Sequence, residues 1–238
     1  MKSRFNILKL IFLVLISSTL FAFSNWKNRD RNVTDIHVEF YGENTMFITQ
    51  SSVSKLLIQN QEGVTDKAKR IIDLNELEAA LKSNEMIKTA DVYMSVDGEI
   101  YAEIEQKKPL ARVLSENFYI DEMGSWMPLS ENYSARVPLV TGNINKSDLK
   151  GVYVIAKHID QDEFLKEHIT EIHQNSNSDF KLRLRTNNII IELGDTTALQ
   201  TKFNNLKAFY QKALKDNIID SYSKLNLRFT SQVICTKK

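Results

Sequence analysis

The stretch Glu99–Leu114, EIYAEIEQKKPLARVL, decides how the chain is organised, because a strand-like pattern stops within it and then resumes. Ile100, Ala102 and Ile104 alternate with polar residues, which is typical of a strand with one buried face. Lys107-Lys108-Pro109 then interrupts the alternation. Proline removes a backbone donor and favours extended geometry in the residue before it. We therefore predict a boundary between two domains here, with both lysines in solvent.

The segment before this boundary, residues 33–106, predicts a small α+β domain. Val33–Phe40 and Ile87–Val96 alternate as strands, and Thr49–Asn60 and Asp73–Asn84 have polar N-caps and helical spacing. Asp97-Gly98 is a strong hairpin signal, because a type I′ turn needs positive φ at both central residues. The order strand, helix, helix, strand, strand predicts one sheet with two helices on one face.

The segment after the boundary, residues 107–238, predicts a mostly antiparallel β domain with helices on one face. Asp179–Asp195 predicts a hairpin, and Leu225–Cys235 alternates as a last strand. Thr196–Asn217 predicts a helix with a threonine N-cap and one apolar face, formed by Leu199, Phe203, Leu206, Tyr210 and Leu214. The predicted fold class of the whole chain is α+β.

The N-terminus combines basic residues with an apolar run, which indicates a membrane segment. We expect a short tail at residues 1–6, a transmembrane helix at residues 7–26 and a polar linker at residues 27–32. A cleaved signal peptide is the alternative, since Ala22-Phe23-Ser24 is similar to a cleavage site. Both an anchor and a signal peptide would direct the rest of the chain across the membrane. The length of the apolar segment favours a retained anchor. Basic residues flank the run on both sides, so they do not fix its orientation.

Composition argues against several classes of function. With 31 basic and 30 acidic residues, the chain lacks the clustered positive charge of a nucleic-acid-binding protein. The single cysteine, Cys235, cannot form an internal disulfide, and the isolated glycines form no phosphate-binding loop motif. A zinc-binding helix has two histidines four residues apart, whereas His168 and His173 are five residues apart. We expect no catalytic residue, metal, cofactor or small-molecule substrate, with a hydrolase that uses these histidines as an alternative.

Two parts of the sequence resemble known families. The order of elements in residues 33–106, beside a membrane segment, resembles a POTRA domain, a module that binds polypeptide partners. KKPLARV, FYIDEMGSWMPLS, VPLVTG and the terminal LNLRF together resemble the FtsQ/DivIB family of bacterial cell-division proteins. The short tail departs from the family pattern, as does Phe229, where some relatives carry tyrosine.

The FtsQ/DivIB resemblance implies a non-enzymatic scaffold in the inner membrane. Its N-terminus is then cytoplasmic, and its two domains are periplasmic at the division septum. The implied partners are FtsB-like and FtsL-like division proteins, with which it assembles the septal cell-wall synthesis complex. A periplasmic POTRA-type chaperone of outer-membrane protein assembly is an alternative, which a mature N-terminus near Asn25 would indicate.

The last strand is the candidate site. A strand at the edge of a sheet has unpaired backbone N–H and C=O groups, to which a partner strand can bind. Arg228 is predicted to point away from the core, free to bind a partner carboxylate through two hydrogen bonds. The resemblance to the FtsQ/DivIB family implies that the last strand contacts division partners. We therefore predict that the following residues bind a partner: Leu225, Asn226, Leu227, Arg228, Phe229, Thr230 and Gln232.

Overall fold

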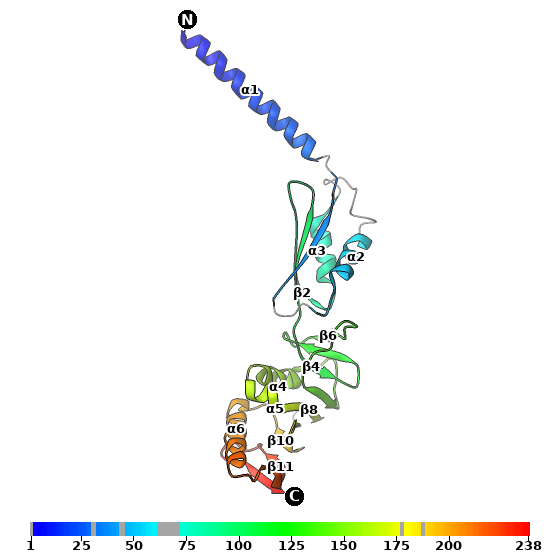
Figure 1. Cartoon of the computed structure of the whole chain (residues 1–238), viewed down its shortest axis with the longest axis vertical. Coiled ribbons are helices and arrows are strands. Elements are labelled where there is room, and N and C mark those ends of the chain that lie inside the picture. Colours follow the sequence, from blue (N-terminus) through cyan, green and yellow to red (C-terminus); the bar gives the residue numbers. More distant parts are fainter. Residues whose placement is uncertain (1, 30–31, 43–45, 61–71, 177–178, 187–188) are drawn as a thin grey trace. The chain divides into compact units, whose positions relative to one another are not determined.

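The computed structural model describes residues 2–29, 32–42, 46–60, 72–176, 179–186 and 189–238 (Figure 1). The chain forms two compact units, which divide between Gln106 and Lys107. The first unit contains an N-terminal helix and a small α+β domain. The second contains, among the described residues, one nine-stranded sheet with helices. The predicted α+β fold class is confirmed.

The N-terminal helix, α1 (Lys2–Arg29), extends beyond the predicted membrane segment at both ends. The sequence has no glycine or proline before Gly42, so no helix-breaking residue ends α1 before Arg29. Lys9–Trp26 has a mean hydropathy of 1.5, and among the described helices only α1 is long and apolar enough to cross a membrane. Its side chains in this span are all exposed. A signal sequence also passes this test of length and composition.

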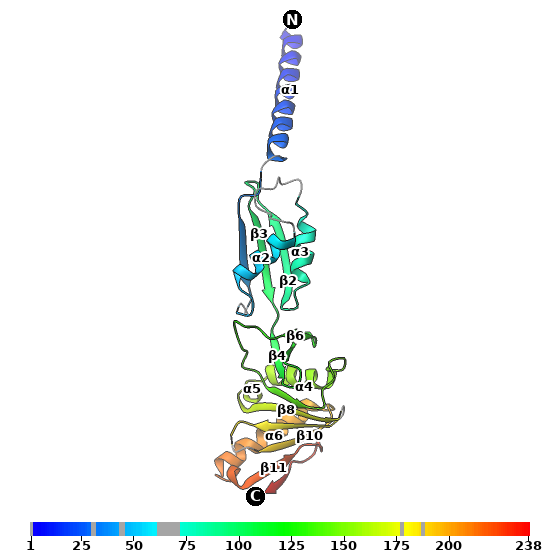
Figure 2. The same cartoon turned by 90° about the vertical axis from the view of Figure 1, so that its right-hand side faces the viewer.

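In its described residues, the small domain contains a three-stranded sheet and two helices. Its elements are β1 (Ile36–Tyr41), α2 (Gln50–Asn60), α3 (Leu74–Lys82), β2 (Ile87–Met94) and β3 (Ile100–Gln106). β3 is the central strand, parallel to β1 and antiparallel to β2, so the predicted β2–β3 hairpin is confirmed. The two helices pack on the sheet, with which they share one hydrophobic core (Figure 2).

Two polar side chains fix the local structure of the small domain. Asp73 caps α3 as predicted, because its carboxylate accepts hydrogen bonds from the backbone amides of Asn75 and Glu76. Gln106, at the end of β3, is only 2% exposed. Its Oε1 accepts from the amides of Phe47 at 2.9 Å and Ile48 at 3.1 Å, and its Nε2 donates to the Ile48 carbonyl at 3.2 Å. Gln106 therefore holds the segment before α2 against the end of the sheet.

The second domain contains one mixed sheet. In the order in which they lie side by side, its strands are β12 (Ile234–Lys237), β11 (Tyr222–Asn226), β10 (Ile190–Gly194), β9 (Asp179–Leu184), β8 (Ile169–Ser176), β7 (Leu139–Gly142), β4 (Pro109–Val113), β5 (Phe118–Asp121) and β6 (Trp126–Pro128). The pairs β4–β7, β7–β8 and β10–β11 are parallel, and the other neighbouring strands are antiparallel. The sheet is therefore mostly antiparallel, as predicted.

In the part of this domain that the structure describes, three α-helices pack against the sheet through one shared core, and Figure 1 shows them on the same side of it. They are α4 (Lys150–Asp160), α5 (Glu163–His168) and α6 (Leu199–Lys215), and a short 3₁₀ helix, η2 (Ile219–Ser221), follows them. The predicted apolar face of α6 is buried except for Leu214, because the helical period places Ala213 on that face instead. The predicted threonine N-cap is wrong, since Ala198 in a left-handed conformation precedes the helix.

The two lysines after the boundary are ion-paired, so the prediction that they lie free in solvent was wrong. Lys107 Nζ lies 3.0 Å from Oδ2 of Asp121, whose side chain is fully buried. Lys108 Nζ lies 2.7 Å from Oδ2 of Asp160 at the end of α4. A buried carboxylate such as that of Asp121 needs a compensating charge, and Lys107 supplies it from the first residue of the second domain.

Candidate partner-binding edge

β11 and β12 form one edge of the nine-stranded sheet. β11 lies inside this edge, because it pairs in parallel with β10 and antiparallel with β12. β12 pairs with β11 on one side and has no neighbouring strand among the described residues on the other. The predicted single strand Leu225–Cys235 is therefore two strands joined by residues 227–233, and the edge is β12.

The first three predicted site residues have structural roles. Leu225 and Leu227 are fully buried in the core of the second domain, so their side chains cannot contact a partner. The Leu227 amide donates to the Glu192 carbonyl on β10 at 2.8 Å, which prolongs the parallel pairing by one residue. Asn226 then ends the strand, because its Oδ1 accepts a hydrogen bond from the Arg228 amide at 2.9 Å, as in an Asx turn.

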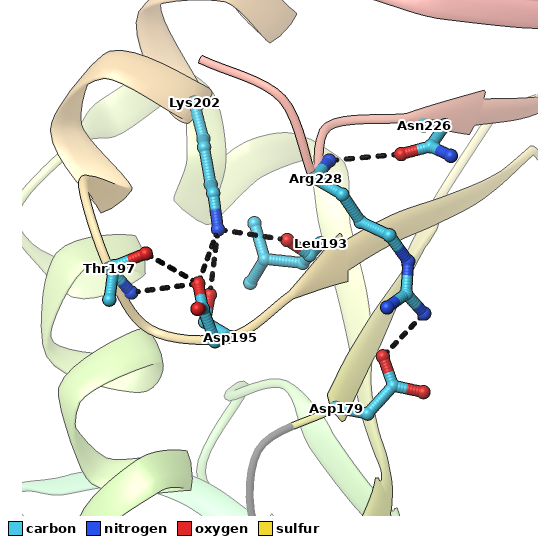
Figure 3. A network of polar contacts seen from close by, with 7 residues as sticks. All are labelled: Asp179, Leu193, Asp195, Thr197, Lys202, Asn226 and Arg228. Atoms are coloured by element: carbon cyan, nitrogen blue, oxygen red, sulfur yellow. Dashed lines mark hydrogen bonds and ion pairs between the residues drawn. The ribbon is translucent and has the colours of Figure 1, made fainter.

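Arg228 was predicted to be free for a partner carboxylate, and the structure contradicts this. Its Nη2 lies 2.5 Å from Oδ1 of Asp179, the first residue of β9 (Figure 3). The arginine side chain passes over Gly194, which has a φ of +72°. A Cβ atom at Gly194 would lie 3.0 Å from Cγ of Arg228. Arg228 therefore fixes the start of the β11–β12 connection to the end of β10 and to β9.

Lys202 on α6 fixes the end of β10 on its other side (Figure 3). Its side chain is almost completely buried, and its Nζ donates to the Leu193 carbonyl at 3.1 Å and to the Asp195 carbonyl and Oδ1 at 2.9 Å each. Hydrogen bonds from Thr197 and Lys202 lower the pKa of Asp195 to about 2. The buried ammonium group thus has a carboxylate partner, and the first turn of α6 is tied to the end of β10.

The other predicted site residues lie in the connection between the two strands. Phe229 is 50% exposed, and the side chains of Thr230 and Gln232 are also exposed. The Thr230 carbonyl accepts a hydrogen bond from Nδ2 of Asn205 on α6 at 2.8 Å, so the backbone of this connection is fixed while its side chains face solvent. A role of these three residues in partner binding stays a prediction.

β12 has backbone groups of the kind that a partner strand needs. The Lys238 amide donates to the Ser221 carbonyl at 2.9 Å, and amides alternate in direction along a strand. The Lys237 amide therefore points away from β11. Ile234 is 44% exposed, whereas Cys235 lies opposite Leu225 and is partly buried, which raises the pKa of its thiol. The polar run Thr230–Gln232, which breaks the alternation after Phe229, is the sequence signal that could have located this separate strand.

The histidines considered as metal ligands lie in different environments. Nδ1 of His168 is 2.8 Å from the Phe164 carbonyl, and its ring stacks on that of Phe164. His173 lies on β8, where its Nδ1 is 2.8 Å from Oγ1 of Thr141. The described residues contain no group of three or more histidine, cysteine, aspartate or glutamate side chains placed to hold a metal ion.

Comparison with known families agrees with this architecture. A family model described as FtsQ/DivIB, C-terminal related, matches residues 108–236, which is more than half of the chain. The chain belongs to the FtsQ/DivIB C-terminal-related family. The matched residues include all nine strands of the sheet except Lys237 at the end of β12.

A second model, described as POTRA-like domain, matches residues 34–105, which contain β1, β2, both helices of the small domain and β3 up to Glu105. No curated protein matches the chain. Both families are generally non-enzymatic scaffolds, so the matches fit a scaffold of bacterial cell division that acts through protein–protein interactions. The apolar helix α1 is compatible with a single-pass membrane anchor in such a protein.

Proposed function

We propose that this chain is a non-enzymatic, single-pass scaffold of the bacterial division machinery and that β12 is its docking edge. In this proposal α1 is retained as an inner-membrane anchor with a cytoplasmic N-terminus, and both domains are periplasmic at the septum. The partners are FtsB-like and FtsL-like division proteins, and the scaffold brings them to the septal cell-wall synthesis complex.

The FtsQ/DivIB-related match carries this proposal, because it covers residues 108–236 of the second domain, which include β12 up to Thr236. The edge supplies the physical mechanism. A partner strand that adds beside β12 forms main-chain hydrogen bonds, and exposed side chains such as Ile234 give selectivity. Lys237 and Lys238 place positive charge at the end of this strand, which disfavours unspecific pairing with other strands.

A proline at an outward-facing amide tests the docking edge. Lys237→Pro removes the N–H that points away from β11 and leaves the bonds between β11 and β12 intact, since edge positions of this kind tolerate proline. Loss of one partner hydrogen bond and the accompanying steric conflict should reduce co-purification of the FtsB-like protein with the detergent-solubilised full-length chain about 10-fold. Lys237→Gln is the matched control, because it removes the same charge but keeps the N–H, and it should capture the partner normally.

Equal capture by Lys237→Pro and the wild type would rule out β12 as the docking edge. Phe229→Ala in the same assay tests whether the exposed residues of the connection contribute, as the sequence predicts. Two further measurements test the cellular part of the proposal. A fluorescent fusion should concentrate at midcell, and the mature chain should retain its N-terminus, whereas a mature chain that begins near Asn25 would exclude the anchor.

A further inference from the structure

A second surface of the β domain has the features of a binding site, away from β12. A cavity of about 430 Å³ opens where the ends of α4 and α5 meet the starts of β7 and β8. Its apolar lining includes Leu139, Ile159 and Ile169. In the sheet, β9, β10 and β11 separate β8 from the edge strand β12, so the cavity is distinct from the proposed docking edge.

The charged residues of the cavity are mostly cationic. Arg136, Lys166 and Arg185 come from three separate segments of the chain, and the one carboxylate in the lining is Asp160. That carboxylate is already occupied, with Lys108 Nζ at 2.7 Å and Lys166 Nζ at 2.9 Å. Burial opposes ionisation of Asp160, but hydrogen bonds from these two lysines outweigh it and lower the pKa of Asp160. The cavity therefore has an excess of positive charge.

Two guanidinium groups remain available at this cavity. Arg136 is exposed and makes no hydrogen bond or ion pair with another described residue. Arg185 is also exposed and uses its Nε to donate to the Glu167 carbonyl at 2.9 Å, which orients the guanidinium group. Planar guanidinium groups bind carboxylates through paired hydrogen bonds, so this arrangement suits a carboxylate beside an apolar group.

We propose that this cavity is a second docking site, which binds an acidic and apolar peptide segment of a partner protein. An aliphatic side chain of the peptide packs on Leu139 and the apolar lining, and an adjacent glutamate or aspartate binds Arg136 and Arg185. A peptide fits better than a small anion, because the cavity is within the size range of sites that take larger ligands and much of its lining is apolar. Because β12 is not involved, the two sites can hold two partner segments at once.

A pair of synthetic peptides tests this proposal on the detergent-solubilised full-length chain. The probe is a fluorescein-labelled peptide of alternating leucine and glutamate, and its matched control has glutamine at each glutamate position. Fluorescence anisotropy should show that the glutamate peptide binds about 10-fold more tightly than the glutamine peptide, with the difference reduced at high salt. Equal binding of both peptides, or binding of neither, would overturn the proposal.

Variants locate the binding. Arg136→Glu should weaken binding of the glutamate peptide about 10-fold or more, and the fold should survive, because Arg136 is exposed and unpaired among the described residues. Lys150→Glu makes the same change of charge at the other end of α4 and should bind as the wild type does. Leu139→Ser should weaken binding through loss of apolar contact. An unchanged affinity in Arg136→Glu, or competition by succinate at the same concentration as the peptide, would contradict the proposal.

The two docking sites can be tested separately. Lys237→Pro should bind the glutamate peptide with wild-type affinity, and Arg136→Glu should leave β12 intact for its partner strand. A loss of peptide binding in Lys237→Pro would mean that the cavity is not an independent site. This result would concern the cavity alone and would not test the proposed role in cell division.

Discussion

Replacement of Gln106 by leucine should destabilise the small domain and leave the second domain unchanged. Gln106 is buried and forms three hydrogen bonds to the backbone of Phe47 and Ile48, which are themselves buried. Leucine has a similar size but no polar group, so the three buried hydrogen bonds of Gln106 to this backbone are lost. At about 1 kcal/mol for each hydrogen bond, the free energy of unfolding of this domain should fall by about 3 kcal/mol.

Hydrogen–deuterium exchange on the full-length chain can measure this loss domain by domain. A fall of about 3 kcal/mol should accelerate exchange of the most protected amides in β2 and β3 roughly 100-fold, while the amides of α4 and β9 serve as an internal control. Gln50→Ala is the matched control, because exposed Gln50 donates a single hydrogen bond, to the Val38 carbonyl at 2.9 Å. Its effect should stay below about 1 kcal/mol. Equal effects of the two substitutions, or faster exchange in the second domain, would refute the reasoning.

Two further predictions concern the second domain. Gly151→Ala should destabilise it in urea unfolding, because the added Cβ would lie 2.5 Å from Cζ of buried Phe180. Overpacking should lower the free energy of unfolding by about 1–3 kcal/mol, whereas the higher helix propensity of alanine should raise it by at most about 1 kcal/mol. A second substitution, Phe180→Leu, should relieve the steric conflict. The melting temperature should also fall in acid. The pKa of Asp195 is about 2 in the folded chain and about 3.9 in the unfolded chain. The ionised carboxylate therefore stabilises the fold above about pH 4, and this contribution to the free energy of unfolding is lost as the pH falls towards about 2. Lys202→Met removes one of the groups that lower the pKa of Asp195, so the melting temperature of this variant should fall less steeply with pH. Thermal melting measured at several pH values would show this.

The elements of the small domain were predictable because their signals are local. Alternation at Ile100, Ala102 and Ile104 identifies a strand, Asp97-Gly98 joins it to its neighbour, and the capping position of Asp73 marks where α3 begins. Each of these signals lies within a few residues of the structure that it determines. The parallel pairing of β1 with β3 has no such local signal, since it joins segments more than 60 residues apart.

The errors concern contacts between distant residues. Lys107 and Lys108 look like solvated residues in sequence, and only the folded chain brings Asp121 and Asp160 to them. Leu225 and Leu227 alternate in the same way whether their strand has one neighbour or two. Their place inside the edge follows from pairing between β11 and β10, and Arg228 is occupied because β9 brings Asp179 beside it. The sequence therefore indicated the right region for the edge and the wrong strand.

The parallel pairing of β1 and β3 determines how the small domain carries mechanical tension. If α1 anchors the chain in a membrane and a partner binds the second domain, as proposed, the pull acts at the start of β1 and at the end of β3. Because both strands run in the same direction, this pull slides one along the other. Their contacts from Ile36–Ile100 to Tyr41–Glu105 then bear the load together, rather than opening one after another. Unfolding under force is governed by the rate of this step, so we expect the parallel pairing to slow the opening of the domain when force acts between an anchor and a partner.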